Sequence, residues 1–138
     1  MNPLHSHPVD EPVSATARRF GIGIGALVAL ALLVDGTFQF LAIPAVVDGA
    51  AEIGFPASVA LWRGIGAALL ASTILYAIPR TSFVGAILIT AYLGGAIATH
   101  VRIGQGAVAP VLAAIVIATL AWGALWLRDT RVRRLLRG

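Results

Sequence analysis

The sequence predicts an all-α integral membrane protein, a bundle of four transmembrane helices with a short interfacial helix between the first two. Of its 138 residues, 59% are hydrophobic and 12% are charged, whereas a soluble domain is roughly 45–50% apolar. The mean hydropathy is +0.91. The apolar residues stand in blocks of about 20, the length of a spanning helix, and not in the alternating pattern of an outer-membrane barrel.

The first span is predicted at residues 20–43. Residues 1–17 contain three prolines and no apolar periodicity, which predicts a disordered cytoplasmic tail. The apolar stretch after Arg18 and Arg19 exceeds the length of a signal-peptide core and lacks a small-residue cleavage site, so we expect a retained helix. Gly21 and Gly25 have the spacing that lets membrane helices approach closely.

Proline, glycine and polar residues mark the ends of the short helix and of the second and third spans. The segment 44–56 is too short and polar to span, and Pro44 followed by Gly54 and Pro56 predicts a short helix at the interface. The second span is predicted at 57–78, and the third at 83–103. Pro79 separates them in a tight turn that offers Thr81 or Ser82 as a helix cap.

The fourth span is predicted at residues 110–127, after the Gly-Gln-Gly segment at 104–106. Trp122 and Trp126 fall near its end, where an aromatic belt is expected. The transmembrane domain thus covers 18–128, and 129–138 form a basic cytoplasmic segment.

Arginine placement predicts the orientation. Arginines gather at the N-terminal flank, the second connection and the C-terminus, whereas the first connection carries only Asp48 and Glu52. The positive-inside rule then places both termini in the cytoplasm, and we expect a bacterial inner (cell) membrane. The arginines of this side are Arg18, Arg19, Arg80, Arg128, Arg131, Arg133, Arg134 and Arg137.

Several kinds of chemistry are excluded or unsupported. The chain has no cysteine and no lysine, which excludes disulfides, thiolate ligands and Schiff bases. His5 and His7 lie in the predicted tail without fixed partners, so no metal site is assigned. The basic charge follows the membrane flanks, so we expect no nucleic-acid binding. No cofactor motif is evident.

Five polar side chains in the spans form the predicted site: Asp35, Gln39, Arg63, Tyr92 and His100. Counted at about 1.5 Å per residue from the outer helix ends, Asp35 lies roughly 12 Å deep, Arg63 about 9 Å and His100 about 5 Å. Gln39, like these three residues, belongs to the outer half of the membrane. Tyr92 shares a helix face with His100. Arg102 points to another helix face than His100 and is expected to extend toward lipid headgroups.

Two interpretations of this group stay open. A charged side chain near a helix centre costs about 2.5–3.5 kcal/mol on insertion scales, so Asp35 and Arg63 are expected to pair within the bundle. The pair is then either a clasp that specifies the fold or part of a cavity open to the outer side. In a cavity, Arg63 could hold an anion or a carbonyl oxygen, and His100, the candidate catalytic residue, could exchange a proton near neutral pH.

Two segments carry a family resemblance, IPRTSFVGAILITAYLGGAIATHVRIG at 78–104 and WLRDTRVRRLLR at 126–137. The connection PAVVDGAAEIGFP at 44–56 fits the same pattern. Together they resemble the DoxX-like family of small four-helix membrane proteins. The resemblance covers about residues 20–137 and implies a four-helix membrane bundle. The family's name derives from a relation to subunits of thiosulfate:quinone oxidoreductase, and most members have no established activity.

The sequence departs from the family pattern at two places. Similar members often have a glycine followed three residues later by lysine and leucine, whereas here Gly36 is followed by Gln39 and Phe40. They often carry a glutamate in the second helix, near the place of Leu69. Because this chain has Asp35 and Arg63 on the same two helices, we expect an interhelical charge contact with its polarity exchanged.

The sequence favours a non-enzymatic membrane component, an accessory or ligand-binding subunit of a redox or envelope system. Its ligand would be small and apolar, a quinone or a lipid, and its partners are the bilayer and either a second copy or another membrane subunit. The alternative is a small membrane enzyme with His100 as acid or base. A transporter is less favoured, because no inverted repeat is present.

Overall fold

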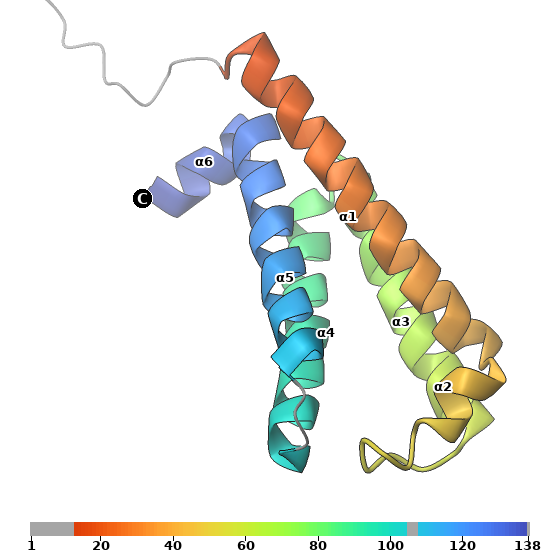
Figure 1. The fold of residues 1–138 in the computed structure, drawn as a ribbon. Helices are drawn as coiled ribbons and strands as arrows, with labels where there is room; N and C mark the ends of the chain where they lie inside the picture. The colour runs from red at the N-terminus through yellow and green to blue at the C-terminus, as the bar shows by residue number, and fades with distance from the viewer. Residues whose placement is uncertain (1–12, 105–107, 138) are drawn as a thin grey trace, which may run out of the picture.

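The computed structural model describes residues 13–104 and 108–137, and in this part the chain is helical. In Figure 1 a short helix lies at one end of the long helices, and another helix projects sideways at the other end. In chain order these are α1 (Ala15–Leu41), α2 (Pro44–Asp48), α3 (Val59–Ala77), α4 (Ser82–Ile103), α5 (Val108–Arg128) and α6 (Thr130–Arg137).

The four long helices form a ring in which each packs on two neighbours. Helix α1 packs on α3 and α5, and α4 packs on the same two helices. All four are long and apolar enough to cross a membrane, which confirms the predicted all-α membrane bundle. Figure 1 shows the α4–α5 pair diverging from the α1–α3 pair toward the end where α2 lies.

The two ends of the bundle differ in charge. Helix α1 begins, α3 ends, α4 begins and α5 ends at one side, and the arginines Arg18, Arg80 and Arg128 stand there. We call this the arginine-rich end. The opposite side holds α2 and the connection 49–58, and we call it the α2 end.

Helix boundaries differ from the predicted ones at the tail and at the short helix. Residues 1–12 of the predicted tail lie outside the described residues, but Ala15–Ala17 are helical, because the Ser14 hydroxyl accepts a hydrogen bond from the Ala17 amide over 3.2 Å. Helix α2 covers only Pro44–Asp48 and ends at Gly49. Gly54 has a φ of 73°, a conformation that favours glycine.

The α3–α4 turn is as tight as expected, but the Thr81 hydroxyl bonds to the preceding helix and not to the start of α4. Thr81 occupies the N-cap position of α4 and makes no capping hydrogen bond there. Its hydroxyl donates to the Leu75 carbonyl oxygen over 2.8 Å, and Ser82 donates to that of Pro79 over 3.2 Å. Because Pro79 has no N–H to donate to the Leu75 carbonyl oxygen four residues back, the Thr81 hydroxyl supplies that partner. The Ser82 bond lies within the turn.

Glycines set the closest helix contacts. A Cβ atom at Gly66 would lie 2.7 Å from the Gly36 carbonyl oxygen and would collide with the Phe40 backbone. A Cβ at Gly85 would likewise collide with the Tyr76 backbone. The crossings of α3 with α1 and with α4 therefore require glycine at these positions.

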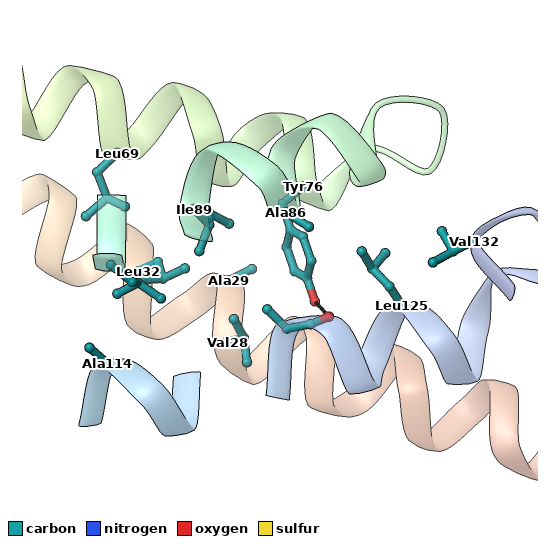
Figure 2. Packing of buried hydrophobic residues seen from close by; sticks show 12 residues of the cluster. Val28, Ala29, Leu32, Leu69, Tyr76, Ala86, Ile89, Ala114, Leu125 and Val132 are labelled. Carbon is teal, nitrogen blue, oxygen red and sulfur yellow. Dashed lines mark hydrogen bonds between the residues drawn. The ribbon is translucent and has the colours of Figure 1, made fainter. Parts of the chain in front are cut away.

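The core lies between the long helices. Figure 2 shows the Tyr76 side chain extending from α3 toward α5, near Leu125. The Tyr76 hydroxyl donates to the Ala121 carbonyl oxygen over 3.0 Å. Arg128 donates to the Tyr76 carbonyl oxygen over 2.9 Å. These contacts tie α3 to α5 across the ring.

Candidate functional site

A cavity of about 760 Å³ lies between the long helices at the α2 end. Its walls come from α1, α2 and the following connection, α3, α4 and α5, and most lining side chains are apolar. It reaches from Ile53 and Phe55 in the connection to Leu32 on α1 and Ile117 on α5. The cavity thus extends from the α2 end of the bundle toward its middle.

The polar side of the cavity is a hydrogen-bonded cluster of Asp35, Gln39 and Tyr92. The Gln39 side-chain nitrogen donates to Asp35 Oδ2 over 2.9 Å and to the Tyr92 hydroxyl oxygen over 2.6 Å. Tyr92 donates in turn to Asp35 Oδ2 over a longer 3.4 Å. Asp35 and Gln39 are four residues apart and share a face of α1, and Tyr92 meets them from α4. The cluster joins α1 and α4 across the ring.

His100 lines the same cavity, nearer the end of α4. Its Nδ1 lies 2.8 Å from the Ala96 carbonyl oxygen, one turn back along the helix. A carbonyl oxygen only accepts hydrogen bonds, so Nδ1 carries the proton and Nε2 is the acceptor of the neutral ring. Asp35, Gln39, Tyr92 and His100, predicted from the sequence as one polar site, therefore share one cavity.

Arg63, the fifth predicted residue, stands apart. Its side chain is exposed and does not line the cavity, and no ion pair with Asp35 occurs in the described part of the chain. The expected Asp35–Arg63 pair and its exchanged polarity are therefore wrong. The physical reason is Gly66: the space beside this small residue is filled by the backbone of α1 near Phe40, and Arg63 lies on another part of the helix surface.

Trp62, the neighbour of Arg63, takes the place in the cavity that we expected for the arginine. It is 8% exposed, lines the cavity and packs its ring against Phe55 with the ring centres 5.9 Å apart. The sequence carried a signal for it: Trp62, Gly66, Leu69 and Thr73 recur at helical spacing, and all four are buried. This stripe is the inward face of α3.

Arg102 lies at the α2 end and is exposed. A Cβ atom at Gly54 would stand 2.9 Å from an Arg102 guanidinium nitrogen, so the arginine reaches over the connection between α2 and α3. The sequence predicts that Arg102 points away from His100, and Arg102 is absent from the cavity wall.

No metal centre is apparent in residues 13–104 and 108–137, where no three His, Cys, Asp or Glu side chains gather. His5 and His7 lie outside the described residues. The cavity contributes Asp35 and His100 as its ionisable side chains other than tyrosine.

The family comparison covers most of the chain. No curated protein and no solved structure matches it. Residues 24–124 match the model of the DoxX-like family, and this range contains α2, α3 and α4, most of α1 and α5, and the whole polar cluster. Four apolar helices around this cluster and a family match over the same residues lead to one conclusion, that the chain belongs to the DoxX-like family.

Proposed function

We propose that this DoxX-like membrane protein binds a small apolar ligand in the cavity at the α2 end, as an accessory component of a redox or envelope system. The ligand would be a quinone or a lipid. The observation that carries the proposal is a cavity of about 760 Å³ with a polar cluster on a mostly apolar wall.

The size and lining of the cavity support a binding role. Ligand pockets occupy about 300–1,000 Å³ and combine an apolar wall with a few placed polar groups. Here Gln39 is fixed by hydrogen bonds to Asp35 and Tyr92. Because these side chains are already held in place, little rotamer freedom remains to be lost on binding.

Charge supports an orientation for the site. The arginine-rich end is expected to face the cytoplasm under the positive-inside rule, which places both termini there and the cavity toward the outer side. We assign the protein to the inner (cell) membrane of a bacterium on this basis. The proposed partner is a second copy of this chain or another membrane subunit.

One observation favours an enzyme as the second candidate. His100 lines the cavity, and its bond to Ala96 leaves Nε2 as an acceptor, the form a general base requires. This function would need a substrate proton within hydrogen-bond reach of Nε2. The binding role needs no such group, and we prefer it.

Two neighbouring glycines of α4 provide a matched test. Gly95 lines the cavity and Gly94 does not, and a Cβ atom at either one would meet nothing within 4 Å. Gly95→Leu should place an apolar side chain in the cavity, whereas Gly94→Leu adds the same group outside it. Native mass spectrometry of each variant purified from membranes reports the bound small molecules together with the oligomeric state.

The expected result is a small molecule retained by the wild type and by Gly94→Leu and lost from Gly95→Leu. Equal retention by both variants would place the molecule outside the cavity and overturn the proposal. A wild-type protein that retains no small molecule would overturn it as well.

A further inference from the structure

Two buried polar atoms have no hydrogen-bond partner in the part of the chain that the structure describes: the Gln39 side-chain oxygen and the Trp62 indole nitrogen. Gln39 is 6% exposed and Trp62 is 8% exposed. Both side chains line the cavity. A buried polar group without a partner costs free energy, so both atoms indicate a partner that the folded chain does not supply.

The orientation of the Gln39 amide follows from its neighbours. Its Nε2 donates to Asp35 Oδ2 over 2.9 Å. The opposite orientation would bring the amide oxygen against the carboxylate oxygen, and two acceptors would then face each other. The oxygen is therefore the atom left over, and it requires a donor.

Trp62 requires the opposite kind of partner. An indole nitrogen carries a hydrogen and only donates, so its partner must accept. The ring is buried and packs against Phe55, so Trp62 meets its partner at a defined place in the wall. Among the described residues, the wall of the cavity thus contains one buried acceptor and one buried donor without partners.

The charge of the cavity wall further restricts the chemical class of the ligand. Among the lining residues no arginine or lysine occurs, and Asp35 brings a carboxylate. An anionic ligand would meet this carboxylate without a compensating arginine or lysine, because Arg63 lies outside the cavity. A cationic amine could approach Asp35, but an ammonium group cannot accept from Trp62.

We propose that the cavity takes a neutral, hydroxyl-bearing apolar molecule, a phenol or an alcohol, which accepts from Trp62 Nε1 and donates to Gln39 Oε1. A hydroxyl is a small neutral group that does both. The inference rests on the proposed binding function and names its ligand class. A molecule with carbonyl oxygens alone satisfies Trp62 and leaves Gln39 without a donor.

Four probes of matched shape test the proposal on the full chain in phosphatidylcholine nanodiscs. They are 4-octylphenol, which donates and accepts, 4-octylanisole, which only accepts, octylbenzene, which does neither, and 4-octylbenzoate, which is an anion. Affinity is measured by equilibrium dialysis. In parallel, ¹⁵N-labelled indole resonances report on Trp62, Trp122 and Trp126 individually.

We expect 4-octylphenol to bind more tightly than octylbenzene by about tenfold for each hydrogen bond formed, with 4-octylanisole between them and 4-octylbenzoate weakest. The Trp62 Nε1–H resonance should move downfield with 4-octylphenol and 4-octylanisole and not with octylbenzene. Trp62→Phe should weaken 4-octylphenol about tenfold. The control Trp122→Phe removes an indole that donates to Thr90 over 2.9 Å, outside the cavity wall, and should leave binding unchanged.

The outcomes separate this inference from the function on which it rests. Equal affinities for 4-octylphenol and octylbenzene, with an unmoved Trp62 resonance, would mean that water satisfies both atoms. That result overturns the hydroxyl proposal and leaves the binding function standing. Failure of all four probes to bind would overturn both. If Trp62→Phe does not fold, the Trp62 Nε1–H resonance and the affinities of the four probes for the wild type still test the hydroxyl proposal.

Discussion

The Arg128 guanidinium donates to the Tyr76 carbonyl oxygen over 2.9 Å and also lies 4.8 Å from the centre of the Tyr76 ring. One arginine of α5 thus supplies a partner for a carbonyl group at the end of α3 and covers the aromatic ring of the same residue. The Tyr76 hydroxyl in turn donates to Ala121 on α5. The two helices are joined at the arginine-rich end by contacts made in both directions.

Replacing Arg128 by lysine should destabilise the bundle although the charge is kept. A lysine lacks the planar group that stacks on a ring and donates sideways to a carbonyl oxygen. We expect a loss of about 1–2 kcal/mol, the size of one charged hydrogen bond with part of a cation–π contact. Unfolding in mixed detergent micelles, followed by circular dichroism, measures it. Arg131→Lys, at an exposed position of α6, is the control, and an equal loss there would contradict the assignment.

Replacing Gly66 by alanine should separate α1 from α3. Its new methyl group would overlap the backbone near Phe40, and overpacking of this kind typically costs about 1–3 kcal/mol. Gly64→Ala lies on the same helix, where a Cβ atom meets nothing within 4 Å, and should leave stability unchanged or slightly higher. The same unfolding measurement compares the two variants. Equal stability of both would show that the helices do not cross at Gly66.

Two double-mutant cycles test the hydrogen bonds of the cavity. Gln39→Leu and Tyr92→Phe remove the two partners of a 2.6 Å hydrogen bond, so the double variant should lose less than the sum of the single losses, with a coupling of about 1 kcal/mol. Asp35→Asn and Arg63→Gln should add within about 0.5 kcal/mol, because no ion pair joins them. Coupling in the second cycle and additivity in the first would reverse the description of this site.

Replacing His100 by alanine should weaken ligand retention and leave the fold intact. Its hydrogen bond runs to Ala96 within the same helix, so little interhelical packing depends on it. The retained small molecule, measured by native mass spectrometry, should decrease, while Val101→Ala, exposed on the next residue and outside the cavity wall, should keep it. Full retention by His100→Ala would remove this histidine from the binding site.

The membrane fold could be predicted because apolar length and proline position determine it almost alone. Pro44 and Pro79 bound helices where expected, and four long apolar stretches became the four long helices. The predicted start of the first helix was too late, because the Ser14 hydroxyl caps α1 ahead of the apolar stretch. A capping bond of this kind depends on local geometry that periodicity does not reveal.

The site could be predicted only where its residues are spaced along one helix. Asp35 and Gln39 on α1, and Tyr92 and His100 on α4, each share a face, and those two faces meet at the cavity. Trp62 and Arg63 required the rotation of α3 about its own axis, which the contact of Gly66 with α1 determines. A glycine in one sequence does not reveal whether it leaves room for a side chain or for another helix.

The long helices are closer together at one end of the bundle than at the other (Figure 1). At one end, Tyr76, Arg128 and the Gly85 contact hold α3, α4 and α5 close together, while toward α2 the helix pairs spread apart (Figure 1). A change in the angle between the helix pairs would move them least at the end where they are closest, so it would alter the width of the cavity and spare the contacts at that end. Ligands with apolar tails of different length would then fit the same cavity. Each would be recognised at its hydroxyl group by Gln39 Oε1 on α1 and Trp62 Nε1 on α3.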